Sequence, residues 1–183
     1  MSIITIIPQE SQLIIALQFL KLSNFKTIIA TANPNHESLL KSYGATHIIN
    51  RTLPLPSQIN QIKSLAPDLQ YAFDAVGTKE TGFLCAHSFG PQGGHIVSSL
   101  GVAKEVLEEG GERKVTGRGI YSGPMAHVES AGRIWGEMTG ALERGLIRGF
   151  PYRVKEGGLG GIKGALEAVK KASGYKVVIH PQE

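Results

Sequence analysis

Short apolar runs alternate along the chain with longer segments that carry apolar residues on one side. The runs are rich in Ile, Val and Ala, as expected for strands that are covered on both faces of a parallel sheet. Five of them lie at residues 3–7, 26–32, 46–50, 71–76 and 95–100. The segments between them have the apolar spacing of helices, at residues 11–22, 36–43, 57–65 and 78–88. The pattern therefore predicts strands that alternate with helices.

This alternation predicts right-handed βαβ units and a parallel sheet. We therefore expect an α/β fold with a doubly wound, Rossmann-like parallel sheet of about six strands, in a single domain over residues 1–183. The sixth strand, at 115–121, is the weakest because two glycines interrupt it. Further helices are expected at 127–144 and 162–171, and a last strand at 176–180.

The composition is that of an ordinary globular protein. The chain has 183 residues, of which 42% are apolar, and this is enough for one buried core. Its net charge is +4, but Lys and Arg are interleaved with Glu and form no basic stripe that carries aromatic residues, so we expect no nucleic-acid partner. Gln or Lys breaks the apolar runs well short of a membrane span, so we expect no membrane contact and a cytoplasmic location.

The cysteine and histidine content limits the kinds of site that the chain can form. Cys85 is the sole cysteine, which excludes an intramolecular disulfide and a zinc site built from several thiolates. The six histidines show no metal-ligand spacing, so we expect no metal. Cys85 and His87 are two residues apart on a predicted helix and face different directions, so we expect Cys85 to lie in the core.

Polar residues near the carboxyl ends of the predicted strands are the candidates for ligand contact, because open α/β sheets bind ligands there. By position these are Gln9, Glu10, Asn33, His36, Arg51, Thr78, Ser98, Ser99, Tyr121 and Ser122. Asn33, His36, Thr78 and Ser99 are the candidates for cofactor binding. Each of these side chains could instead cap a helix or a turn, and for Asn33 capping is the preferred alternative.

Four residues are candidates for general acid or base: Glu10, Asp74, His95 and Tyr121. Asp74 lies within an apolar strand, where an unpaired carboxylate would be costly. It is therefore either paired for structural reasons or a carboxylic acid with a raised pKa that could transfer a proton. Tyr71 and His95 are expected on neighbouring strands.

Four segments carry a resemblance to a known family: ATANPNHESLLKSYGATHIIN, YAFDAVG, GGHIVSSLG and FPYRVKEGGLGGIKGALEAVKK. In this order they resemble the cofactor domain of the medium-chain dehydrogenase/reductase superfamily, above all its zinc-free fungal enoyl reductases that serve polyketide synthases in trans. The resemblance covers nearly all of the chain. It implies a preceding catalytic domain, absent from this sequence, and either a homodimer joined at strand 115–121 or a complex with a synthase.

The turn after the first strand, Pro8-Gln9-Glu10-Ser11, departs from the family pattern because it contains no glycine. Glycines in this turn let the backbone approach a pyrophosphate. Pro8 lacks an amide donor, and Glu10 brings a negative charge close to a negative ligand. We therefore expect that no cofactor is used. If a dinucleotide does bind, the absence of an acidic residue directly after the second strand favours NADPH over NADH.

Three functions follow from these observations. The first is a non-redox biosynthetic enzyme, derived from an enoyl reductase, that acts on a hydrophobic polyketide-like intermediate by acid/base chemistry: isomerisation, cyclisation or dehydration. The second is an NADPH-dependent enoyl or quinone reductase that a partner subunit or a dimer completes. The third is a non-catalytic binding partner of a synthase. The sequence places them in this order, with a hydrophobic small molecule as the expected ligand.

Overall fold

The computed structural model describes residues 1–6, 10–111, 113–120, 128–172 and 174–182, without the side chains of residues 10–12 and 130. The chain divides into two compact units, Met1–Ile147 and Arg148–Glu183. The Rossmann-like fold lies in the first unit. The assignment of all 183 residues to one domain stays a prediction.

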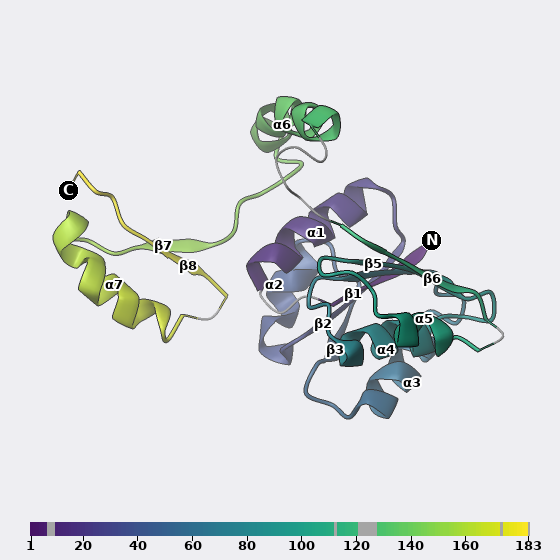
Figure 1. Cartoon of the computed structure of the whole chain (residues 1–183). Coiled ribbons are helices and arrows are strands. Elements are labelled where there is room, and N and C mark those ends of the chain that lie inside the picture. The colour runs from purple at the N-terminus through teal and green to yellow at the C-terminus, as the bar shows by residue number, and fades with distance from the viewer. Residues whose placement is uncertain (7–9, 112, 121–127, 173, 183) are drawn as a thin grey trace. The chain divides into compact units, whose positions relative to one another are not determined.

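The first unit is built on a six-stranded sheet in the order β3-β2-β1-β4-β5-β6 (Figure 1). All neighbouring strands are parallel. This order is that of dinucleotide-binding doubly wound folds, in which it reverses between β1 and β4. The predicted fold class is therefore confirmed. The strands are β1 (Ser2–Ile6), β2 (Thr27–Ala32), β3 (His47–Asn50), β4 (Tyr71–Asp74), β5 (Gly94–Ser98) and β6 (Val115–Gly119).

Helices cover both faces of this sheet. In Figure 1, α1 and α2 lie on one side of it, and α3, α4 and α5 lie on the other. The helical segments are α1 (Glu10–Leu22), the short 3-10 helix η1 (Pro34–His36), α2 (Glu37–Ser42), α3 (Leu55–Leu65), α4 (Lys79–Ser88), α5 (Lys104–Glu108) and α6 (Val128–Glu143). The bounds of α1, α2, α3, α4 and α6 lie within a few residues of those predicted from the sequence, whereas no bounds were predicted for η1 and α5.

A cluster of buried apolar side chains lies between the sheet and the α3–α4 layer. Ile4, Ile29 and Ile96 come from β1, β2 and β5 and are fully buried, together with Ile62 of α3 and Phe89 at the end of α4. Burial of such a side chain stabilises the fold by about 1.5–3 kcal/mol. The apolar runs that predicted the strands are thus the residues that hold the two layers together.

Cys85 lies in this core, on α4, and is fully buried as expected. Burial raises the pKa of its thiol, because the interior disfavours the charged thiolate, and the nearby negative charge of Asp74 raises this pKa further. The thiol is therefore neutral in the folded protein.

The second unit contains β7 (Tyr152–Val154), the 3-10 helix η2 (Gly158–Gly161), α7 (Ile162–Val169) and β8 (Lys176–Val178). The predicted last strand is β8, and it pairs with β7 in a separate two-stranded parallel sheet. The sequence did not predict β7, because this strand has three residues, all of them exposed, and no apolar run marks it.

Gly93 precedes β5 with φ +76°, and a Cβ atom at this position would overlap the backbone carbonyl of Lys114. We expect Gly93→Ala to lower the free energy of unfolding by more than about 2 kcal/mol, from backbone strain and steric overlap together. Gly111→Ala is the matched control, because Gly111 has φ +59° but, among the described residues other than its chain neighbours, no heavy atom lies within 4 Å of the added Cβ. Its expected loss is about 1 kcal/mol. Equal losses in urea unfolding would contradict the predicted overlap.

The raised pKa of Cys85 predicts that the native protein resists thiol reagents. We expect labelling by Ellman's reagent at pH 8 to be slow and limited by unfolding, whereas the urea-unfolded chain, whose thiol has a pKa of about 8.5, reacts at once. Above that pH the unfolded thiol ionises and the folded one does not, so the stability that this residue contributes falls as the pH rises. Rapid labelling of the native protein would contradict the buried placement.

Candidate functional site

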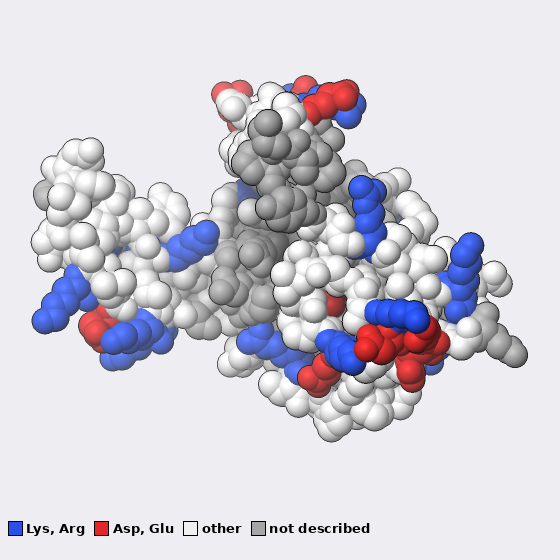
Figure 2. All heavy atoms as spheres, viewed as in Figure 1, with Lys and Arg blue, Asp and Glu red and all other residues white. Residues whose placement is uncertain are grey.

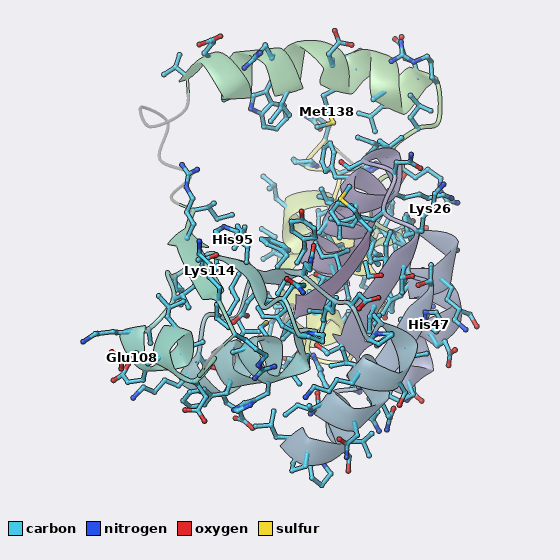
Figure 3. The ribbon with its side chains drawn as sticks, turned by 90° about the vertical axis from the view of Figure 1, so that its right-hand side faces the viewer. Lys26, His47, His95, Glu108, Lys114 and Met138 are labelled. Atoms are coloured by element: carbon cyan, nitrogen blue, oxygen red, sulfur yellow. The ribbon has the colours of Figure 1, made fainter. Side chains whose placement is uncertain are left out.

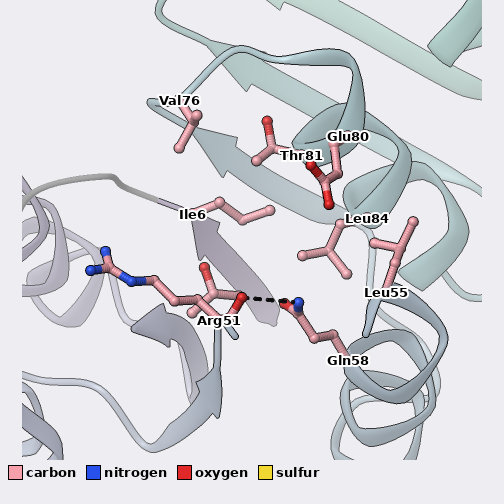
Figure 4. A pocket seen from close by; sticks show the side chains of 9 residues that line it. Ile6, Arg51, Leu55, Gln58, Val76, Glu80, Thr81 and Leu84 are labelled. Carbon is pink, nitrogen blue, oxygen red and sulfur yellow. Dashed lines mark hydrogen bonds between the residues drawn. The ribbon is translucent and has the colours of Figure 1, made fainter. Parts of the chain in front are cut away.

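A pocket of about 200 Å³ opens at the carboxyl edge of the sheet (Figure 4). It lies beside the reversal of strand order between β1 and β4, where folds of this kind bind ligands. Its walls come from the ends of β1 and β2, from the loops after β3 and β4, and from α3 and α4. The lining residues are Ile6, Thr31, Arg51, Leu55, Gln58, Val76, Glu80, Thr81 and Leu84.

Asp74 ends β4 directly behind this pocket and is only 1% exposed. Its Oδ1 accepts hydrogen bonds from the amides of Val76 (2.9 Å) and Gly77 (3.0 Å), and its Oδ2 accepts one from the hydroxyl of Thr81 (2.7 Å). These contacts match the structural alternative given for this buried carboxylate. A role for Asp74 as acid or base stays a prediction.

Thr78 and Ser99 hold the loops beside the pocket. Thr78 caps α4: its hydroxyl accepts a hydrogen bond from the amide of Thr81 (3.3 Å), while its own amide donates to the Thr81 hydroxyl (3.1 Å). Ser99 follows β5, and its hydroxyl donates to the carbonyl oxygen of Ala75 (2.9 Å). Both side chains are exposed at the carboxyl edge, as predicted, but neither lines the pocket.

The opposite wall is anchored by Gln58, which is 7% exposed. Its side-chain amide donates hydrogen bonds to the carbonyl oxygens of Leu53 (2.7 Å) and Arg51 (3.4 Å), so that α3 holds the loop after β3. In Figure 4 the Arg51 side chain extends away from Gln58. Its backbone and aliphatic part thus belong to the wall, and its guanidinium brings a positive charge to the rim.

Asn33 and His36 do not line this pocket. The side-chain oxygen of Asn33 accepts a hydrogen bond from the amide of Asn35 (3.0 Å) and so caps η1, as the preferred alternative for this residue required. His36 ends η1 and is buried. Contact of either residue with a cofactor stays a prediction.

The structure places His95 at the other end of the sheet from Asp74. Tyr71 pairs with His95 at the start of β4 and β5, whereas Asp74 pairs with Ser98 at their carboxyl ends. Three residues along a strand separate the two levels by about 10 Å. The His95 ring bonds to the Thr116 hydroxyl (2.8 Å), and Figure 3 shows His95 beside Lys114. His95 therefore lies away from the candidate site.

The structure does not describe the side chains of two further candidates. Glu10 begins α1, but its side chain is not described, and neither are Pro8 and Gln9 of the glycine-free turn. Tyr121 lies beyond the described end of the loop after β6. The roles predicted for these residues stay predictions.

Sequence reasoning named Arg51 but missed the other lining side chains. The apolar ones, such as Val76 and Leu55, carry no chemical signal of their own. Two signals were available for the polar ones. First, the carboxylate of Asp74 within an apolar strand predicts hydrogen-bond donors nearby. Second, the spacing from Thr78 to Thr81 is that of a capping box, in which the two residues cap the start of a helix reciprocally.

The described part of the chain bears on three of the broader expectations. It contains no group of three or more His, Cys, Asp or Glu side chains that could hold a metal ion. No helix among the described residues has the length and apolar character needed to cross a membrane. On the face shown in Figure 2, basic and acidic side chains lie side by side around α5, where Lys79 pairs with Glu105 (3.1 Å) and Lys104 with Glu108 (3.1 Å).

Comparison with known proteins found similar fungal enzymes. The chain is 31% identical over 184 residues to the trans-enoyl reductase tasC of Hapsidospora irregularis, covering 89% of this chain and 46% of the relative. It is 28% identical over 185 residues to the enoyl reductase component lovC of the lovastatin nonaketide synthase of Aspergillus terreus, covering 90% and 49%. The chain thus spans about half the length of these relatives. No protein-family model matches it.

Solved structures share the fold. A quinone oxidoreductase of Pseudomonas syringae superposes with a TM-score of 0.72 at 18% identity, over 98% of this chain and 57% of the other. The CurK enoyl reductase superposes with a TM-score of 0.66 at 17% identity, over 98% and 55%. The resemblance seen in the motifs is therefore confirmed: the chain is similar in sequence to fungal trans-enoyl reductases, and its fold is that of the cofactor domain of medium-chain dehydrogenases/reductases.

Proposed function

We propose that this chain is the dinucleotide-binding half of an NADPH-dependent enoyl reductase that acts in trans with a synthase. The relatives support this proposal, because they are named as a trans-enoyl reductase and as the enoyl reductase component of a synthase. Since the chain spans about half of their length, the proposal assigns the remaining wall of the substrate cleft to a second domain or subunit.

The observation that carries the proposal is the chemistry of the pocket at the carboxyl edge. Ile6, Val76 and Leu84 offer apolar surfaces against which an adenine ring can pack, and Arg51 brings a cation to the rim. Pockets that enclose whole ligands measure about 300–1,000 Å³. A pocket of about 200 Å³ is thus suited to one end of a dinucleotide. The residues present fit the adenosine end.

The choice of NADPH over NADH rests on the charges at the ends of β2 and β3. Folds of this kind that bind NAD hold the ribose 2′-hydroxyl with an acidic residue, whereas a nearby arginine accommodates the 2′-phosphate of NADP. Asn33 follows β2 in this chain and offers no carboxylate. Arg51 follows β3, and its amide donates to the carbonyl oxygen of Ala32 at the end of β2 (3.1 Å). An arginine therefore stands beside the position proposed for the ribose.

NADPH, when bound, would supply the hydride for reduction of an enoyl double bond. In this proposal the chain's own residues bind and orient the adenosine end. Asp74 already accepts three hydrogen bonds, and His95 lies at the opposite end of the sheet. The proposal therefore assigns proton transfer to neither of these residues.

The comparisons favour the second of the three functions derived from the sequence. The relatives named above are reductases, and neither is named for isomerisation, cyclisation or dehydration. We therefore place reduction with NADPH ahead of non-redox chemistry and ahead of the expectation that no cofactor is used. A synthase as partner belongs to the proposal. Self-association at the edge strand β6 and a cytoplasmic location stay predictions.

The proposal predicts a phosphate-dependent affinity that isothermal titration calorimetry can measure. We expect the wild-type protein to bind NADPH more tightly than NADH, and 2′,5′-ADP more tightly than 5′-AMP. Arg51→Ala should weaken 2′,5′-ADP about tenfold, because it removes a charge-assisted contact, and should leave 5′-AMP unchanged.

Lys41→Ala is the matched control. It removes a cation that pairs with Glu37 on α2 (2.7 Å) and that does not line the pocket. We expect it to leave all four affinities unchanged. Equal binding of 2′,5′-ADP and 5′-AMP by the wild-type protein, or no binding of either, would overturn the proposal.

A further inference from the structure

Thr81 lines the pocket, yet its hydroxyl belongs to a hydrogen-bond network behind the pocket wall. The hydroxyl donates to Oδ2 of Asp74 (2.7 Å) and accepts a hydrogen bond from the amide of Thr78 (3.1 Å). It therefore joins the end of β4 to the start of α4. In Figure 4, Thr81 lies beside Val76 and Glu80 along one wall.

The carboxylate of Asp74 fixes the backbone of this wall. Oδ1 accepts the amides of two successive residues, Val76 (2.9 Å) and Gly77 (3.0 Å), while Oδ2 accepts the hydroxyl of Thr81. A carboxylate has enough lone pairs for all three donors, and hydrogen bonds to an ionised group are stronger than those between neutral groups. Because Asp74 is only 1% exposed, water competes little for these bonds.

The loop after β5 supports the same wall from behind. Gly77 has φ +71°, and a Cβ atom added to it would lie 2.7 Å from Cβ of Leu100. The Ser99 hydroxyl also donates to the carbonyl oxygen of Ala75 (2.9 Å). The loop from β4 to α4 is therefore held by the hydrogen bonds of Asp74 and by contacts with the loop after β5.

We propose that Asp74 and Thr81 are positioning residues. They hold the loop from β4 to α4, which carries Val76 of the pocket wall, in the conformation that receives the adenosine end of a dinucleotide. The inference rests on the proposed function, because it takes its ligand from there. In this inference Asp74 and Thr81 do not contact the ligand; they affect its binding by fixing the conformation of the pocket wall. Without the network, Val76 would sample other positions, and binding would have to select the receptive one.

The test is to remove the Thr81 hydroxyl while keeping its shape. We expect Thr81→Val to raise the dissociation constant of 2′,5′-ADP about fivefold to tenfold, because Oδ2 of Asp74 loses a donor and the Thr78 amide loses an acceptor. Thr81→Ser keeps the hydroxyl and should restore the wild-type affinity. Asp74→Asn, which replaces one carboxylate oxygen by an amide nitrogen, should weaken binding in the same direction.

Thr46→Val is the matched control for a loss of stability alone. The Thr46 hydroxyl accepts a hydrogen bond from the amide of Ile28 (2.9 Å) and donates one to its carbonyl oxygen (3.0 Å), at the amino end of the sheet. A merely structural role for Thr81 predicts that Thr46→Val and Thr81→Val lower the unfolding midpoint and that neither changes the affinity.

The outcomes separate the two proposals. If wild-type protein binds 2′,5′-ADP and Thr81→Val binds it equally well, the positioning role is overturned and the proposed function stands. If wild-type protein binds no 2′,5′-ADP, both are overturned. Should Thr81→Val fail to fold, Asp74→Asn decides the question, and an unchanged dissociation constant for that variant overturns the inference.

Discussion

The structure of the first unit depends on the central position of β1. This strand pairs in parallel with β2 on one side and with β4 on the other. Because connections between parallel strands cross over the sheet, the chain must cover both faces with helices, and the middle of β1 is closed to water: Ile4 has no exposed surface. The same arrangement brings the carboxyl ends of β1, β2 and β4 to one edge, and the pocket lies there.

Charge at this edge is distributed in two different ways. Asp74 is buried, and its carboxylate accepts hydrogen bonds from two backbone amides and one hydroxyl, which fix the loop from β4 to α4. Arg51 is exposed and carries its positive charge at the rim, where an incoming anion would meet it. Desolvation explains the division, because a buried ion must find all its partners within the protein whereas an exposed one keeps its hydration. The charge of Asp74 therefore organises the wall from inside the protein, and the charge of Arg51 lies at the rim of the pocket.

Much of the fold could be predicted from the sequence because each buried strand is a short apolar run. β7 lacks that signal, since it is exposed and three residues long. The candidate site was harder to predict, because it depends on register. His95 was predicted as an acid or base together with Asp74. His95 lies near the start of β5, however, and in a parallel sheet the strands begin at the end opposite to the edge that binds ligands. Val76 and Leu84 line the pocket because of how the elements pack, and an apolar residue type does not by itself predict a place in a pocket.

The wall behind the pocket can be written as a short sequence signature, D-x-x-G-T-x-x-T, over residues 74–81. Each position has its own physical requirement. Asp74 supplies two acceptor oxygens, and Thr78 and Thr81 cap the helix reciprocally. Gly77 is required for two reasons, because its φ is positive and because an added Cβ would lie against Leu100. In this chain, whose first turn has no glycine, the signature still marks the carboxyl edge of the sheet.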